Sequence, residues 1–96
     1  MKANIAATAL RTIQLEAQSI SGLAPFINDT FEKAIATIHA SKGRLVISGI
    51  GKSAIVAQKI VATLNSTGTP ALFMHAADAI HGDLGMVQDE DVVMII

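Results

Sequence analysis

The first place in this 96-residue sequence where residue types and spacing suggest chemistry is a glycine-rich segment with one lysine. Residues 48–54 read SGIGKSA and join an apolar run to a helical pattern. Glycines let the backbone approach a ligand closely, and the unpaired N–H groups at the start of a helix attract anions. Lys52 adds a positive charge, and Ser48 and Ser53 add hydroxyl groups. The segment therefore predicts a loop that binds an anion, such as the phosphate of a small molecule.

Other interpretations of the glycine segment stay open. The nucleotide P-loop pattern fails, because the position that needs its first glycine holds Val46. The dinucleotide fingerprint G-x-G-x-x-G/A is matched by Gly49, Gly51 and Ala54, but it also wants an acid at the end of the next strand, where His75 stands. A purely structural role is the third possibility, with both glycines serving tight packing between strand and helix.

A second polar segment, residues 75–85 (HAADAIHGDLG), carries two of the chain's histidines and two acids. Histidine is the side chain most easily poised near neutral pH for proton transfer, so His75 and His81 are candidate acid–base groups. A simpler alternative is a polar loop whose histidine contacts a backbone carbonyl. A metal held by His75, His81 and Asp83 is a further alternative, but their spacing matches no zinc signature, and we expect no metal.

The pattern of apolar residues predicts the elements that carry these segments. Continuous apolar runs rich in β-branched residues favour strands buried on both faces, and 3.6-residue spacing favours helices. The second of these helices would have Pro25 in its first turn. The expected elements are helices over 3–20, 25–40 and 53–66, strands at 45–47, 71–74 and 92–96, and one helical turn at 76–80. This order predicts an α/β fold, in which ligands bind beyond the carboxyl ends of the strands.

Composition excludes several classes of protein. The absence of cysteine excludes a disulfide-stapled secreted domain and permits a cytoplasmic location, which we expect. A net charge of −1 predicts no nucleic-acid partner, and no apolar run is long enough for a membrane span. The hydrophobic content of 51% is high for so short a chain. We therefore expect much of this apolar surface to meet a partner, or the chain to be part of a longer domain.

Three motifs, at residues 43–53, 62–70 and 81–86, resemble the sugar isomerase (SIS) domain and within it most closely the arabinose-5-phosphate isomerases. The resemblance implies a parallel, doubly wound sheet preceded by two N-terminal helices. It implies that residues 1–96 are the N-terminal part of a single SIS domain. Leading helices would occupy 1–42, and a strand–helix–strand–loop–strand unit would occupy 43–96. The chain would cover about the first half of that domain and end in its third strand.

The resemblance also implies a function. The reaction would interconvert D-ribulose 5-phosphate and D-arabinose 5-phosphate through an enediol, without a cofactor, for synthesis of the sugar acid Kdo in lipopolysaccharide or capsule. Lys52 and His81 would be catalytic. A homodimer or homotetramer would form through the N-terminal helices. The substrate-binding candidates are Ser48, Gly49, Gly51, Ser53, His75 and Asp83.

Two further expectations follow from the same resemblance. A serine-rich phosphate loop and the carboxylate that acts as general base would come after Ile96, so residues 1–96 alone would be inactive. The alternative function is a non-catalytic SIS domain that senses a sugar phosphate.

Overall fold

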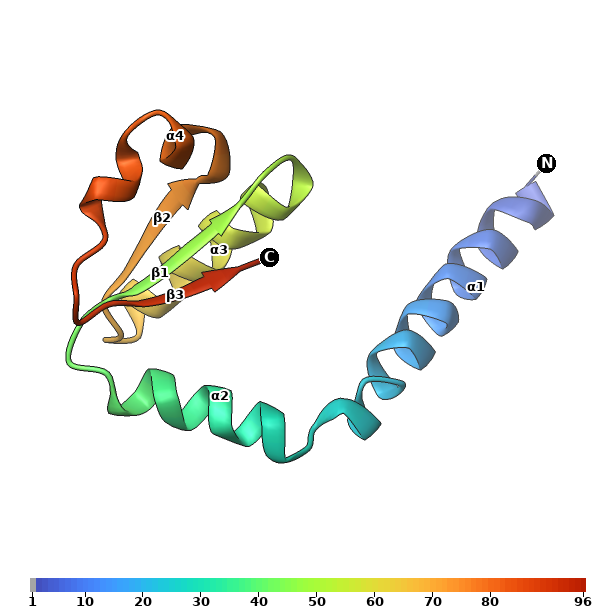
Figure 1. The fold of residues 1–96 in the computed structure, drawn as a ribbon. Coiled ribbons are helices and arrows are strands. Elements are labelled where there is room, and N and C mark those ends of the chain that lie inside the picture. The colour runs from blue at the N-terminus through green and yellow to red at the C-terminus, as the bar shows by residue number, and fades with distance from the viewer. Residues whose placement is uncertain (1) are drawn as a thin grey trace. The chain divides into compact units, whose positions relative to one another are not determined.

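The structure is a computed structural model that describes residues 2–96, with side chains described from Asn4 onward. It divides into a first unit that ends at Ile35 and a second unit, Ala36–Ile96. The boundary falls inside helix α2 (Asp29–Ala40), and each unit is described by itself (Figure 1).

The first unit consists of helical segments. Helix α1 spans Lys2–Ser21, which confirms the helix predicted over residues 3–20. At its end the Gly22 N–H donates to the Gln18 carbonyl at 2.9 Å. The apolar stripe of α1 is exposed: Leu10 keeps 59% and Ile13 63% of its surface. Within the first unit, this helix therefore carries an apolar face that no other described residue covers.

The predicted start of the second helix was wrong. Pro25 lies in a short 3-10 helix, η1 (Ala24–Phe26), and α2 begins only at Asp29. The reason is the side chain of Asn28, whose Oδ1 accepts the Phe31 N–H at 3.1 Å. An asparagine that satisfies one of the free N–H groups of the first turn is a strong signal for a helix start.

The second unit contains a parallel three-stranded sheet in the order β2-β1-β3. Strands β1 (Leu45–Gly49), β2 (Ala71–His75) and β3 (Val92–Ile95) confirm the three predicted strands and the parallel α/β fold (Figure 1). Every residue of the central strand β1 is buried, as its continuous apolar run predicts.

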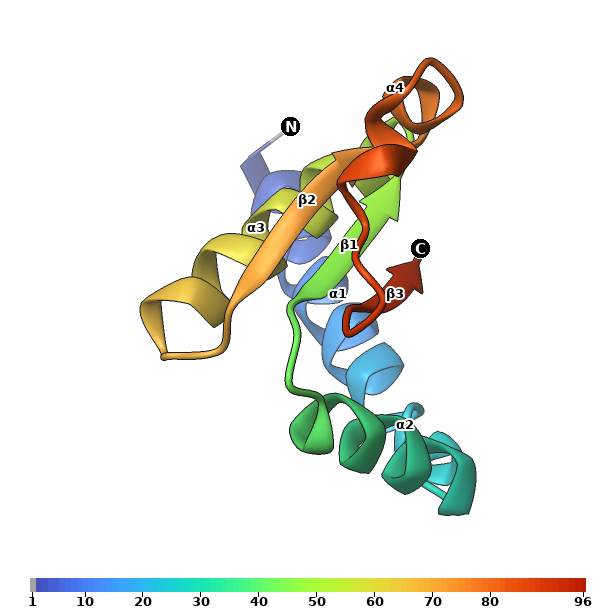
Figure 2. The same ribbon diagram turned by 60° about the vertical axis from the view of Figure 1, so that its left-hand side comes forward.

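Helix α3 (Lys52–Ser66) lies along one face of the sheet and contacts β1 and β2 (Figure 2). Ala57, on α3, is fully buried against Leu45 and Ile47 of β1, and partly buried apolar side chains from α3, β2 and β3 surround them. Side chains alternate along a strand, so Val93 and Ile95 point to the opposite face, where they keep 43% and 80% of their surface. The core thus sits between α3 and the sheet.

The connection from β2 to β3 begins with α4 (Ala76–Ile80), which confirms the predicted helical turn. A second short element, the 3-10 helix η2 (Asp83–Met86), was not predicted. In the described part of the chain, no helix is both long enough and apolar enough to span a membrane.

Candidate functional site at the carboxyl edge of the sheet

The two chemistry-bearing segments leave the sheet from neighbouring strand ends. In the parallel register of β1 and β2, Gly49 pairs with His75, and each is the last residue of its strand. The glycine loop and the histidine segment therefore begin side by side at one edge (Figure 1). Parallel α/β sheets bind ligands at this edge.

The two glycines of the loop are needed for different reasons. Gly51, just before α3, has φ 61° and ψ −134°, and a Cβ placed there would meet no heavy atom within 4 Å. Glycine is therefore needed here for the backbone conformation and not for space, because residues with a side chain disfavour positive φ. At Gly49 the limit is space: a Cβ would lie 3.1 Å from the Ile96 carbonyl oxygen and 3.3 Å from the Ala54 nitrogen. Gly49 thus serves packing, while Gly51 leaves the loop open in front of α3.

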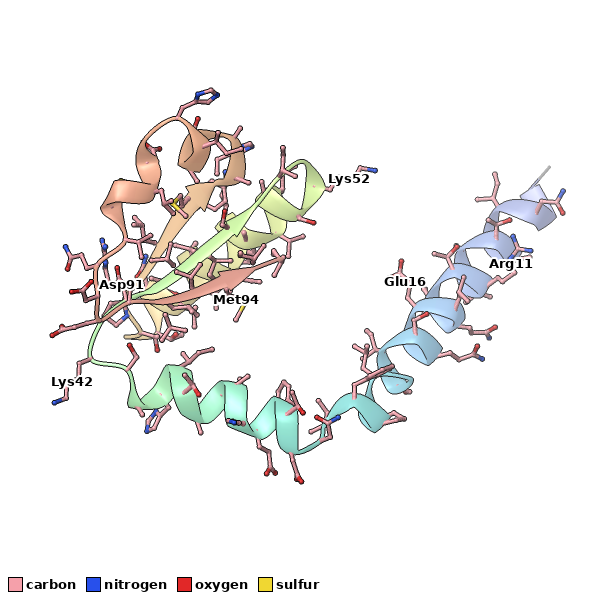
Figure 3. All side chains as sticks on the ribbon, in the orientation of Figure 1. Arg11, Glu16, Lys42, Lys52, Asp91 and Met94 are labelled. Carbon is pink, nitrogen blue, oxygen red and sulfur yellow. The ribbon has the colours of Figure 1, made fainter. Side chains whose placement is uncertain are left out.

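Lys52 is the first residue of α3, and its side chain extends from that end of the helix into solvent (Figure 3). Its ammonium group makes no hydrogen bond or ion pair with the side chains described from Asn4 onward or with the described backbone. An anion could therefore bind Lys52 without displacing a protein contact. Ser53, the next residue, is half-buried, and Ser48 is buried within β1 at 5% exposure.

The ring of His75 is held at the start of α4. Its Nδ1 accepts the Ala77 N–H at 3.1 Å, so the neutral ring carries its proton on Nε2. Phe73 packs edge-on against the same ring, with the ring centroids 6.3 Å apart. The alternative interpretation had a histidine contacting a backbone carbonyl; the His75 ring instead accepts a backbone N–H. His75 offers an N–H donor beside the glycine loop.

His81 and Asp83 lie at a break between α4 and η2. His81 ends α4, with its backbone N–H bonded to the Asp78 carbonyl at 3.1 Å, and Gly82 follows with φ 124°. Both side chains are exposed, and neither has a hydrogen-bond partner among the described residues. Both are therefore free to contact a bound molecule.

The described residues contain no group of three or more histidines, cysteines or acids arranged to hold a metal ion. The edge instead combines an exposed cation at a helix start with two imidazoles on the segment that leaves the adjacent strand end. Such a set can stabilise a negative charge and move protons. The structure brings the two segments to one edge, and the individual roles assigned to the eight candidate residues stay predictions.

Sequence reasoning missed one polar cluster, at the opposite edge of the sheet. Arg44 and Asp91, which precede β1 and β3, form an ion pair with Nη2 and Oδ2 3.0 Å apart. The guanidinium hydrogen bonds of Arg44, and then the backbone N–H groups of Gln88 and Arg44, hold the pKa of the Asp91 carboxyl well below its usual range. The available signal in the sequence was a charged residue of opposite sign directly before each of two predicted strands.

The family model described as the SIS domain matches residues 37–96. The arabinose 5-phosphate isomerase KdsD of Pseudomonas aeruginosa is 49% identical over 89 residues, which cover 93% of this chain and 27% of that protein. The arabinose 5-phosphate isomerase GutQ of Escherichia coli K12 is 49% identical over 86 residues, covering 90% of this chain and 27% of that protein.

Among solved structures, c3406 of Escherichia coli CFT073 in complex with arabinose 5-phosphate matches with a TM-score of 0.91 and 34% sequence identity. The match covers 99% of this chain and 50% of that one. The chain thus spans about a quarter of the length of these curated relatives and half of that solved chain.

Proposed function

The chain belongs to the SIS-domain family, and from that premise we propose that it is part of a phosphosugar isomerase that interconverts D-ribulose 5-phosphate and D-arabinose 5-phosphate. The observation that carries the proposal is the register of β1 and β2, which starts the Lys52 loop and the His81 segment from adjacent strand ends. The names of the relatives KdsD and GutQ, each 49% identical, support the choice of sugar.

The proposed reaction runs through an enediol. A base removes a proton from C1 of the ketose, the electron pair forms the C1–C2 double bond, and the carbonyl oxygen gains a proton. Return of a proton to C2, with loss of the proton on the C1 hydroxyl, gives the aldose. In this proposal the carboxylate that acts as this base would lie beyond Ile96, as the resemblance to the family implies.

Lys52 and His81 supply the remaining chemistry in this proposal. The unpaired ammonium of Lys52 stabilises the negative charge that develops on the enediol oxygens, an effect of about 3–4 kcal/mol for a preorganised donor in other enzymes. The exposed imidazole of His81 opens the sugar ring or shuttles a hydroxyl proton.

Substrate contacts come from both segments in this proposal. The backbone around Gly49 and Gly51, with the hydroxyl groups of Ser48 and Ser53, forms the first part of the sugar-phosphate site. His75 and Asp83 complete it on the side of the histidine segment, and no cofactor takes part. The positive φ of Gly51 and the open space in front of it support a backbone that a ligand can approach.

The test is turnover of the full-length protein with D-arabinose 5-phosphate, followed as formation of the ketose. Lys52→Ala and His81→Ala should each lower kcat by at least about 100-fold, the range seen when one such donor is removed. Lys59→Ala is the matched control, because Lys59 is an exposed lysine further along the same helix. Near-normal turnover of either site variant would remove that residue from the mechanism.

The sensor alternative makes a different prediction in the same assay. A sensor would bind arabinose 5-phosphate, detected by calorimetry, and the full-length wild-type protein would show no turnover. Residues 1–96 alone should also show no turnover with either sugar, because the base and the serine-rich phosphate loop would be missing. Measurable isomerisation by this segment would contradict that part of the proposal.

We place the enzyme in the cytoplasm, where its product enters Kdo synthesis for lipopolysaccharide or capsule, and we propose a homodimer or homotetramer. The exposed apolar stripe of α1 supports an interface between subunits. Light scattering should report a smaller assembly when Ile13, 63% exposed on this helix, is replaced by glutamate. An unchanged mass would remove α1 from the interface.

A further inference from the structure

A cluster of polar contacts joins the starts of β1 and β3 at the edge of the sheet opposite the candidate site (Figure 3). The Asp91 carboxylate accepts the backbone N–H of Arg44 at 2.8 Å, Arg44 Nη2 at 3.0 Å and the Gln88 N–H at 2.8 Å. Arg44 Nη2 also donates to the Met86 carbonyl at 2.8 Å. One guanidinium thus binds both the carboxylate and the backbone of the long β2–β3 connection.

The cluster is well fixed. The Asp91 side chain is 2% exposed and the Arg44 side chain 34%. The Val92 N–H donates to the Arg44 carbonyl at 3.0 Å, so the backbone of Arg44 is also tied to β3. Arg44 Nε also donates to Asp91 Oδ1 at 3.4 Å, so the carboxylate accepts two N–H groups from one guanidinium and holds it in one orientation.

The contact with Met86 reaches toward the candidate site along the chain. Met86 is the last residue of η2, which begins at Asp83, two residues after His81. The other end of this segment is fixed where His75 closes β2 and binds the first turn of α4. His81 itself is exposed, and its side chain has no hydrogen-bond partner in the part of the chain whose side chains are described. Its position therefore depends on the two anchored ends of its segment.

We propose that Arg44 is a positioning residue of the isomerase: by holding Met86 it fixes the η2 end of the segment that carries His81. The inference rests on the proposed function, in which His81 moves a proton. Arg44 does not touch the substrate in this arrangement, and it acts only through the placement of the segment. A reacting group displaced by about 1 Å lowers a rate about 100-fold, so one lost tether has a measurable effect.

The first test compares Arg44→Met with a control in the full-length protein, at a temperature well below unfolding. Arg44→Met should lower kcat between about 10-fold and 100-fold and change KM less than about threefold. Asn65→Ala is the matched control: Asn65 Oδ1 accepts the Ala71 N–H at 2.8 Å and so holds the start of β2, not η2. It should lower the melting temperature and leave kcat unchanged.

Arg44→Lys separates the ion pair from the tether. Lysine keeps a positive charge opposite Asp91, but its side chain is one atom shorter and has no planar fork, so its ammonium facing Asp91 does not reach the Met86 carbonyl as Arg44 Nη2 does. We expect a melting temperature close to that of the wild type and a kcat still reduced. Wild-type kcat in this variant would show that the contact with Met86 is not needed, and would overturn the inference.

Double variants test whether Arg44 acts through His81. In a His81→Ala background, Arg44→Met should cause no further loss of kcat, since the group that it positions is gone. Losses that multiply, or wild-type kcat in Arg44→Met with only a lower melting temperature, would overturn the inference and leave a structural role.

A measurement without turnover keeps the two proposals distinguishable. Amide hydrogen exchange at Gly82–Gly85 should be faster in Arg44→Met than in Asn65→Ala, because only the first change releases η2. A wild-type protein that fails to isomerise the sugar would refute the proposed function. Equal exchange in the two variants would refute the tether.

Discussion

Replacing Gly43 by alanine should destabilise the protein strongly, because the backbone of another segment occupies the space for a side chain. Gly43 lies between α2 and β1 and is half-buried. A Cβ there would overlap the carbonyl group of Glu90 and lie 2.7 Å from the Asp91 nitrogen, whereas ordinary Cβ contacts begin at 3.4 Å. No side-chain rotation can relieve an overlap with backbone atoms.

The expected magnitude follows from the movement that the extra carbon requires. The connection before β1 and the loop before β3 must separate by roughly 0.7 Å or more. The hydrogen bond from Ser41 Oγ to the Glu90 carbonyl, 3.2 Å long, would then exceed bonding distance. Overpacking costs about 1–3 kcal/mol and the lost hydrogen bond about 1 kcal/mol. We expect a loss of about 3 kcal/mol, or about 10 °C in melting temperature.

Gly85→Ala is the control for this prediction. Gly85 lies in η2, a Cβ there meets nothing within 4 Å, and its φ is not positive. Alanine at such a position should change the free energy of unfolding by less than about 1 kcal/mol. Thermal and urea denaturation of both full-length variants would measure the difference. Equal stability of the Gly43 and Gly85 variants would refute the reasoning.

The other predictions concern the loop, the ion pair and a helix cap. Gly51→Ala should lower the free energy of unfolding by about 1–2 kcal/mol, because alanine disfavours the positive φ, and should raise KM for the sugar phosphate. Gly68→Ala, at φ 95° in an exposed turn, should lower the free energy of unfolding without changing KM. Because the pKa of Asp91 is lowered on folding from its ordinary value of 3.8, the charged carboxylate stabilises the fold at pH values above 3.8. In denaturation curves, the difference in unfolding free energy between wild type and Asp91→Asn should stay constant from about pH 7 to 5 and narrow below about pH 4. Asn28→Ala should cost about 1 kcal/mol, seen as lost helical circular dichroism at lower denaturant, with unchanged turnover.

The strands could be predicted because consecutive apolar residues indicate a strand that is buried on both faces. Leu45, Val46 and Ile47 form an apolar run between polar neighbours, and a strand enclosed on both faces needs that pattern. The edge that carries the candidate site followed from the same reasoning, since polar segments come directly after two of the runs. A parallel sheet then places the two segments together, as the register of Gly49 with His75 shows.

Other features depended on choices that local pattern does not decide. Pro25 fits the first turn of an α-helix and a 3-10 turn equally well, and the side chain of Asn28 settles the start of α2. The pair of Arg44 and Asp91 is 47 residues apart in sequence. It forms only because β1 and β3 are neighbours in the sheet, with Leu45 paired to Val92, and the strand order is a tertiary property.

The polar groups at the amino edge of the sheet stabilise the fold, and those at the carboxyl edge are available to a ligand. At the amino edge, the polar groups of Arg44 and Asp91 satisfy one another, so a substitution there leaves a buried group without its partner and acts on the melting temperature. At the carboxyl edge, Lys52 and His81 are exposed and have no partner among the described residues, so a substitution there should act on binding and turnover. Arg44 contacts Asp91 within the first edge and, through Met86, the segment that leads to the second. Stability and turnover should therefore separate for most substitutions in the second unit and fall together when Arg44 is replaced by methionine.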